Sequence, residues 1–150
     1  MQYVEFFASD LQDRLLKCLE QCDWKAGRYL AQLLSTGQFE SMLGTGSKLF
    51  FLMDEDAVVS FVTLTHQDCI ADESMYPWLG FLYTEPNYRG HRYSEQIIQH
   101  ALSVAKDMGH NSVFLATDHV GLYEKYGFTY IDNRLDVWGE MSRIYRIDLE

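Results

Sequence analysis

The stretch from Trp78 to Ile98 constrains the fold of this chain more than any other part of the sequence. It begins with an apolar, aromatic run that has the length of a buried strand. The run breaks at Pro86, which lacks a backbone N–H and so cannot continue a central strand. After the glycine-containing turn Tyr88–Arg92, apolar residues recur at helical spacing. A strand, a basic turn and a helix in this order aim unpaired N–H groups at a bound anion.

The turn is basic although the chain as a whole is acidic. Arg89, His91 and Arg92 gather there in a chain whose formal net charge is -10. A solvated helix start with chance arginines explains this stretch equally well, since one glycine is weak evidence for phosphate binding. The acidic balance argues against a broad nucleic-acid interface, which needs a basic face to displace counterions.

The rest of the sequence predicts a single mixed sheet with flanking helices. Helices are expected from Leu11 to Cys22, with Ser9 and Asp10 as N-cap, and over 24–34, 92–108 and 120–126, the last capped by Asp118. Strands are expected over 1–7, 49–53, 57–65, 78–84, 112–117, 128–135 and 141–149. The unit from 78 to 117 is predicted to be a right-handed parallel βαβ unit, and the other strands to be antiparallel. The length of 150 residues predicts one domain, 1–150, of the α/β (α+β mixed sheet) class.

Targeting features and cysteines bear on where the protein works. No apolar run reaches the roughly 18–20 residues that span a membrane, and the first residues do not resemble a secretory signal. The three cysteines, Cys18, Cys22 and Cys69, are an odd number without the spacing of a disulfide framework or a metal site. We therefore expect a cytoplasmic protein with reduced cysteines, no metal and no membrane partner.

Two segments resemble the GNAT superfamily of N-acetyltransferases. Pro86–Ser94 is similar to the loop that binds the pyrophosphate of acetyl-CoA in that family, and Leu122–Phe128 (LYEKYGF) is similar to its short helix and following strand. The resemblance covers nearly the whole chain. It implies the GNAT-like acyl-CoA N-acyltransferase fold, a central, mostly antiparallel sheet with one parallel βαβ unit and flanking helices. It also implies acetyl-CoA (coenzyme A) as co-substrate.

The resemblance implies two sets of contacts with acetyl-CoA. The pyrophosphate loop contributes Arg89, Gly90, His91, Arg92, Tyr93 and Ser94. The strands before and after the helix splay apart in the family, and the backbone of Phe81, Leu82 and Tyr83 is expected to receive the pantetheine arm. His119 is a further expected cofactor contact. The chain departs from the family pattern at Arg92, where glycine is usual, and Arg92 either pairs with a phosphate or obstructs the loop.

The resemblance also assigns a catalytic acid. Tyr123 matches the tyrosine that protonates the thiolate in this family, and an ordinary phenol, with a pKa of about 10, holds its proton at neutral pH. The alternative is that Tyr123 only packs in the core. A backbone N–H near Phe81 or Leu82 is the expected oxyanion partner. Glu140 is a predicted general base, with Asp72, Glu73 and His66 as open alternatives, and members of the family can also act without a dedicated base.

Substrate choice in the family depends on the first two helices, the segment before the fourth strand and the last strands. Trp24, Tyr29, Asp72 and Trp78 are the predicted substrate contacts, and the same segments also contain Asp68, Glu73, Tyr76, Trp138 and Glu140. Aromatic rings with carboxylates suit a small cationic amine. The predicted function is transfer of the acetyl group of acetyl-CoA to a primary amine of a small molecule by direct attack. The alternatives are a protein or peptide amine, an aminoacyl-tRNA, which the acidic balance disfavours, or an inactive acyl-CoA-binding regulatory domain. A homodimer is expected by analogy with the family.

Overall fold

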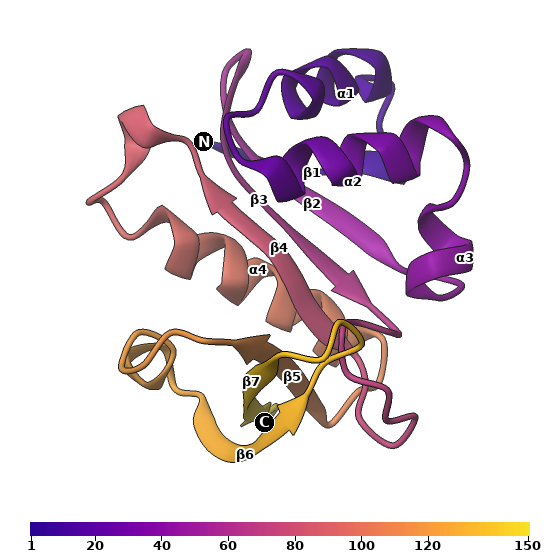
Figure 1. The fold of residues 1–150 in the computed structure, drawn as a ribbon. Helices are drawn as coiled ribbons and strands as arrows, with labels where there is room; N and C mark the ends of the chain where they lie inside the picture. The colour runs from indigo at the N-terminus through magenta and orange to yellow at the C-terminus, as the bar shows by residue number, and fades with distance from the viewer.

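The computed structural model describes all 150 residues, which form a seven-stranded sheet with helices on both faces (Figure 1). The strand order is β1-β2-β3-β4-β5-β7-β6, and β4 and β5 are the only parallel neighbours. The strands are β1 Gln2–Glu5, β2 Lys48–Asp54, β3 Ala57–Thr65, β4 Trp78–Thr84, β5 Ser112–Thr117, β6 Thr129–Leu135 and β7 Met141–Asp148. The helices are α1 Gln12–Glu20, α2 Lys25–Ser35, α3 Phe39–Leu43 and α4 Tyr93–Asp107. The predicted mixed sheet with one parallel βαβ unit is confirmed.

Each face of the sheet has its own apolar core. The helix α4 covers one face, where Ile97, Ile98 and Ala101 pack against the central strands. The helices α1 and α2 cover the other face through residues such as Leu15 and Leu30. The strand β3 is buried from Val58 to Thr65 because both of its faces are covered, which explains why its sequence is apolar without alternation. None of the helices combines the length and the apolar content that crossing a membrane requires.

Three local expectations were wrong, each for a local reason. The helix α1 starts after Leu11 without a side-chain cap, because the Ser9 hydroxyl accepts a hydrogen bond from the Leu11 N–H (3.0 Å) in a short turn instead. The helix expected over 120–126 is a single 3₁₀ turn, Glu124–Tyr126, because Gly121 adopts a left-handed conformation (φ +91°) that breaks a helix. Asp118 therefore caps no helix. The helix α3 was not expected.

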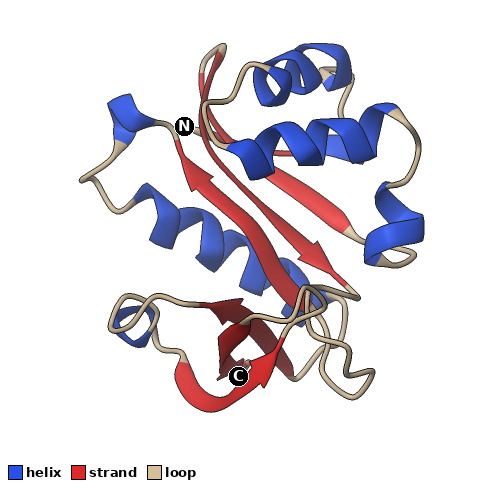
Figure 2. Ribbon diagram, in the orientation of Figure 1, coloured by secondary structure: helices blue, strands red, loops and turns tan.

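The strands β4 and β5 separate soon after they meet. They pair only at Trp78–Phe114 and Leu79–Leu115, and beyond these residues they diverge (Figure 2). On its other edge β4 stays paired with β3 as far as Thr84. We call the divergence of β4 and β5 beyond Leu79 the split.

A β-bulge lies in β4 at the start of the split. The pairing with β3 skips from Gly80 to Tyr83, so that Phe81 and Leu82 together oppose Val62. Phe81 has a positive φ of 48°, which is uncommon for a residue with a side chain. As a result the Phe81 side chain packs toward α2, whereas that of Leu82 packs toward α4.

Candidate active site

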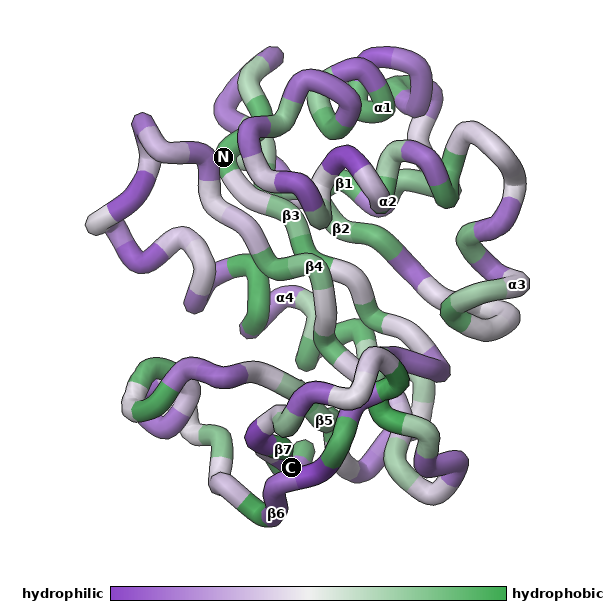
Figure 3. The backbone as a smooth tube through the Cα atoms, viewed as in Figure 1, coloured by the Kyte–Doolittle hydropathy of each residue, from purple (hydrophilic) through white to green (hydrophobic).

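A basic hollow lies between the end of β4 and the start of α4. It has a volume of about 270 Å³ and is lined by Thr84, Tyr88, Arg89, Gly90, Arg92, Tyr93 and Ser94. The connection that forms it is largely hydrophilic (Figure 3). The first N–H groups of α4 are free of helical partners at this point, so the hollow combines cationic side chains with the positive end of a 15-residue helix. It is suited to an anion.

Arg89 is held at the end of β4. Its Nε donates to the carbonyl of Thr84 (3.0 Å), and its guanidinium carbon lies 5.3 Å from the centre of the Tyr83 ring. Two N–H-bearing groups of the guanidinium remain available, because only Nε has a partner in the protein. Arg89 therefore presents its charge to the hollow from a fixed position.

Arg92 stands at the N-cap of α4 in the left-handed conformation, with φ +61° and ψ +27°. Side chains rarely adopt this conformation, which explains why glycine is usual at this place in the pattern. The guanidinium reaches forward to the first turn of the helix and forms two hydrogen bonds with Glu95, Nε–Oε1 at 2.7 Å and Nη2–Oε2 at 2.9 Å. This contact lowers the pKa of Glu95. Arg92 thus lines the hollow while its guanidinium pairs with the acidic residue in the first turn of α4.

Tyr123 lies on the α4 face of the sheet, in the same core as Leu82. Only 6% of Tyr123 is exposed, and rings of Tyr126, Phe128 and Tyr145 surround it. Its hydroxyl has no hydrogen-bond partner in the protein. Thr63 Oγ1 is the only partnerless side-chain oxygen or nitrogen that is fully closed off from solvent, so the Tyr123 hydroxyl remains accessible to solvent. Burial, and to a smaller extent Tyr126, raises the pKa of Tyr123 to about 12, so the phenol keeps its proton at neutral pH.

An apolar pocket opens on the α2 face, opposite Tyr123. Its volume is about 370 Å³, and it reaches Gly80 and Phe81 on β4 and Ala116 on β5, on both sides of the split. Its wall is formed by Trp24, Ala26, Tyr29, Leu33, Met42, Leu43, Gln67, Asp68, Cys69, Val137 and Trp138. Asp68 is the one charged residue in this lining.

The Asp68 carboxylate lies directly over the backbone of Gly80. A Cβ atom at Gly80 would be 2.6 Å from Asp68 Oδ2 and 3.1 Å from Thr63 Oγ1, so only glycine leaves room for the carboxylate. Asp68 Oδ1 accepts a hydrogen bond from the Cys69 N–H (2.6 Å), and Oδ2 has no protein partner. Burial raises the pKa of Asp68 to about 6, against smaller opposing effects of the Cys69 N–H and of the Cys69 side chain.

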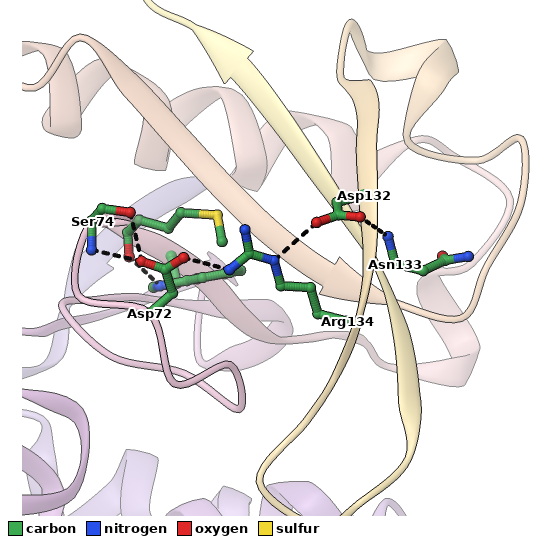
Figure 4. Close-up of polar contacts among 7 residues, drawn as sticks. Asp72, Ser74, Asp132, Asn133 and Arg134 are labelled. Carbon is green, nitrogen blue, oxygen red and sulfur yellow. Dashed lines mark hydrogen bonds and ion pairs between the residues drawn. The ribbon is translucent and has the colours of Figure 1, made fainter.

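Asp72 belongs to a different structure. It accepts hydrogen bonds from the Ser74 N–H (2.9 Å) and from Arg134, which also binds Asp132 through Nε (3.0 Å), as Figure 4 shows. The Ser74 hydroxyl contributes most to the lowering of the Asp72 pKa to about 2. This network ties the connection between β3 and β4 to β6. It leaves Asp72 little freedom to bind anything else.

The structure brings some of the predicted residues together and separates others. Trp24, Tyr29 and Phe81 line the apolar pocket, and the basic hollow contains the predicted loop residues except His91, which is exposed. Trp78 and the alternative bases Glu73 and His66 lie with Asp72 at an adjoining hollow of about 780 Å³, which shares Gln67, Asp68 and Val137 with the apolar pocket. Trp78 is 1% exposed, and its indole N–H donates to the Met75 carbonyl.

Glu140 and His119 lie at the margins. Glu140 is exposed on the β6–β7 turn, where its N–H donates to Asp136 Oδ1 (3.0 Å), and it lines neither the basic hollow nor the apolar pocket. The His119 carbonyl accepts from the Tyr145 hydroxyl (3.2 Å), and its ring centre is 6.5 Å from that of Tyr123. The sequence marked Asp68 and Trp138 only as members of the specificity segments. The one sequence signal for Asp68 is Gly80, the single small residue in an aromatic strand.

Comparisons with known proteins agree with this fold. Residues 9–128 match the family model described as the acetyltransferase (GNAT) family. No curated protein is similar enough in sequence to be matched. Among solved structures, an aminoglycoside 6'-N-acetyltransferase complexed with coenzyme A has a TM-score of 0.71 at 13% identity, covering 100% of this chain and 98% of that chain.

Two further structures have similar folds. An aminoglycoside 6'-N-acetyltransferase from Enterococcus faecium has a TM-score of 0.72 at 15% identity and covers 100% of this chain and 98% of its own. The spermidine/spermine N-acetyltransferase SpeG from Vibrio cholerae has a TM-score of 0.67 at 14% identity, with coverage of 99% and 93%. At these identities the similarity is one of fold.

Proposed function

Because this chain belongs to the acetyltransferase (GNAT) family, we propose that it is an N-acetyltransferase that transfers the acetyl group of acetyl-CoA to a primary amine of a small molecule. One observation carries the proposal. The basic hollow lies at the C-terminal end of β4, and the apolar pocket reaches both β4 and β5 at the split. A thioester and an amine that occupy these two sites would meet at the split.

The residues of the basic hollow fit the pyrophosphate of coenzyme A. Arg89 supplies a fixed cation with free N–H groups, and the start of α4 supplies backbone donors. Arg92 also lines the hollow, and its guanidinium is held by two hydrogen bonds to Glu95. Beyond Leu79 the edge of β4 is not paired with β5, so it is available to the pantetheine arm as it would be to an added strand. When bound, acetyl-CoA supplies an activated acetyl group with a thiol as its leaving group.

The chain supplies two further groups for the reaction. The bulge at Phe81 and Leu82 gives β4 more N–H groups than Val62 can pair, and a free N–H there would stabilise negative charge on the acetyl oxygen. Tyr123 is the proposed proton donor to the thiolate. Its raised pKa keeps the proton on the phenol, and no hydrogen bond within the protein has to be broken to release it.

The proposal is tested first by titration with acetyl-CoA, read by calorimetry and by thermal shift. Ligand at one hundred times its dissociation constant is expected to add about 2.7 kcal/mol to the free energy of unfolding. Arg89→Ala should weaken binding by roughly 10- to 100-fold, since a charge-assisted contact is lost. Arg14→Ala, which removes an exposed arginine paired with Asp56, is the matched control and should bind normally. Absence of binding at millimolar acetyl-CoA would reject the proposed function.

The alternative of an inactive acyl-CoA-binding domain rests on Arg92 at the glycine position. We expect Tyr123→Phe to reduce acetyl transfer by about 10²-fold or more while leaving acetyl-CoA affinity unchanged. The stability should also be unchanged, because the Tyr123 hydroxyl makes no protein hydrogen bond. Thiol release in the presence of an amine panel measures the transfer. Unchanged transfer in Tyr123→Phe would exclude the tyrosine as the acid, and binding without transfer to any amine would favour the regulatory domain.

Two broader expectations go with this function. We propose that residues 1–150 act as one acetyltransferase domain, since a single sheet runs through both cores. We also propose a cytoplasmic location, in keeping with three cysteines that are all free.

A further inference from the structure

We propose that the acceptor is a primary amine attached to an apolar body of about one aromatic ring, without a second positive charge, and that Asp68 holds its ammonium group and takes its proton. This inference rests on the proposed function and specifies the substrate class and the base of the same site. It differs from the substrates named for the structural neighbours, aminoglycosides and spermidine, which carry several positive charges.

Aromatic rings form much of the wall of the apolar pocket. Trp24 and Tyr29 have ring centres 6.5 and 6.4 Å from that of Phe81. Trp138, which is 75% exposed, adds a fourth ring at the mouth of the pocket. With a volume of about 370 Å³, the pocket is at the small end of the range for ligand sites. Such a wall favours an apolar ring over a polyhydroxylated or extended polar body.

The charge in the pocket is the second observation. Asp68 is the only charged residue of the apolar lining. Of the nearby carboxylates, Glu73 faces the adjoining hollow rather than this pocket, and the other two already have protein partners. Asp72 binds Arg134, and Asp136 Oδ1 accepts the N–H groups of Trp138 (2.9 Å) and Glu140 (3.0 Å). One carboxylate compensates one ammonium. A second ammonium in the same pocket would lose its hydration without gaining a partner, which is costly.

The position of the carboxylate is the third observation. Asp68 Oδ2 occupies the space of the side chain that Gly80 lacks, one residue before the bulge at Phe81. Thr63 Oγ1 lies beside the same space and is fully buried without a hydrogen-bond partner. Of these two oxygens, Asp68 Oδ2 is the one that belongs to the lining of the pocket. An ammonium group carries three N–H donors, one of which can be given to Oδ2.

The chemical step assigned to Asp68 is a proton transfer. The ammonium R–NH₃⁺ gives one proton to Oδ2, which becomes a neutral carboxylic acid, and the nitrogen regains the lone pair that it needs to attack. The titratable groups around Asp68 are Cys69 beside it, Tyr29 from α2 and Asp136 near Cys69 from the β6–β7 turn. The adjoining hollow, which Asp68 also lines, adds His66, Asp72, Glu73 and Tyr76. The strands β4 and β5 add none at this place, since Gly80, Phe81 and Ala116 line it. The raised pKa of Asp68 makes it a better proton acceptor than an exposed carboxylate.

The binding part is tested without acetyl-CoA, by quenching of tryptophan fluorescence and by calorimetry. The probes are 2-phenylethylamine, with one charge and one ring, and spermidine. Binding should quench tryptophan fluorescence because Trp24 and Trp138 line the pocket. We expect 2-phenylethylamine to bind saturably and at least tenfold more tightly than spermidine. Asp68→Asn should weaken the binding of 2-phenylethylamine by roughly 10- to 100-fold. Asp56→Asn, an exposed aspartate on the β2–β3 turn, is the matched control. Spermidine bound as tightly as 2-phenylethylamine, or unaltered affinity in Asp68→Asn, would overturn the inference.

The proton-transfer part is tested by the pH dependence of kcat/KM. In the wild type kcat/KM for 2-phenylethylamine should rise through about pH 6, as Asp68 ionises, and then level off. In Asp68→Asn, kcat/KM should not rise near pH 6. It should rise only as the pH approaches the pKa of the amine itself. An identical acidic limb in Asp68→Asn would overturn the assigned role. Acetylation of spermidine that is insensitive to Asp68→Asn would overturn the inference alone, whereas failure of acetyl-CoA binding would overturn the proposed function instead.

Discussion

Arg92 shows how a single residue replaces a glycine. The start of α4 requires a left-handed residue, and Arg92 adopts that conformation at φ +61°. The conformation costs a side-chain-bearing residue roughly 1–2 kcal/mol. In return the guanidinium binds Glu95 and removes a negative charge from the edge of the basic hollow. Under the proposed function, Arg92 would therefore contribute to anion binding partly through Glu95.

The conformational cost of Arg92 is measurable with two substitutions. Arg92→Ala removes the pair with Glu95 but keeps a Cβ atom in the left-handed conformation, whereas Arg92→Gly removes both. We expect Arg92→Gly to be more stable than Arg92→Ala by about 1 kcal/mol, less than the full cost because glycine gains freedom in the unfolded chain. Urea denaturation of both variants gives this difference. Equal stability would mean that the loop relaxes when the side chain is shortened.

Asp68 makes stability depend on pH in the direction opposite to most carboxylates. Its pKa of about 6 in the folded protein exceeds the value of about 3.9 in an unfolded chain. Between these values the folded state holds more protons, so this residue's contribution to stability is full below about pH 4 and is lost as the pH rises through about 6. Asp72, whose pKa is lowered, acts in the opposite sense and stabilises the protein above about pH 4.

The substitution Asp68→Asn separates the effect of Asp68 on stability from that of Asp72. We expect the variant to be more stable than the wild type at pH 7 by about 1 kcal/mol, a figure reduced from the full shift because Asp68 is partly exposed. At pH 4 the difference should vanish, because the wild-type carboxyl is then protonated in the folded state. Denaturation midpoints at the two pH values provide the measurement. A variant that is less stable than the wild type at pH 7 would show that the carboxylate has a favourable partner.

The strand β4 works differently along its two edges. On one edge β3 holds it as far as Thr84, and on the other it leaves β5 after Leu79. The strand β5 is in turn paired with β7 along its full length, from Ser112–Asp148 to Thr117–Arg143. Each side of the split is therefore fixed to its own part of the sheet. This explains how the split can stay open without a ligand, although an open sheet edge usually seeks a partner.

Hydrogen exchange tests this view of β4. In the free protein we expect fast exchange at the N–H groups of the bulge and of the unpaired edge beyond Gly80, and slow exchange in β2 and β3, which are buried in the sheet. Saturating acetyl-CoA should protect the fast group, because the pantetheine arm would accept its hydrogen bonds. Exchange read residue by residue in β2 is the internal control. Protection spread evenly over the molecule would point to general stabilisation instead.

At the scale of the molecule, charge is unevenly distributed. The chain has a net charge of -10, yet the basic hollow holds Arg89 and Arg92. The overall field would attract the proposed cationic amine and repel an anionic thioester, which the two arginines and the start of α4 would favour locally. The long-range electrostatic force would thus be attractive for the proposed amine and repulsive for the proposed thioester.

Ionic strength should reveal this difference. We expect kcat/KM for a cationic amine to fall several-fold between 0.05 and 0.5 M salt, since the screening length shortens from more than 10 Å to less than 8 Å. The affinity for acetyl-CoA should change less, because long-range repulsion and local attraction are screened together. Steady-state rates and calorimetry across the salt series provide both values. An amine rate that rises with salt would exclude steering by the acidic surface.

Much of this architecture could be predicted from the sequence, and the exceptions have a common cause. The strands at 57–65, 78–84 and 112–117 match β3, β4 and β5 because continuous apolar runs mark strands covered on both faces. The basic turn before α4 was equally visible, since proline, glycine and arginine each leave a local signal. By contrast, the placement of Asp68 over Gly80 depends on how the β3–β4 connection folds back on β4. No local pattern encodes such a contact.

The split also bears on the order of events in a turnover. If the thioester and the amine enter from opposite faces of the sheet, neither blocks the path of the other. Either can then bind first, and either product can leave first. Because both must be present together at Phe81, no acetylated form of the protein would accumulate between them. The enzyme would then follow a random-order ternary-complex mechanism, in which the two substrates reach the split from separate sites.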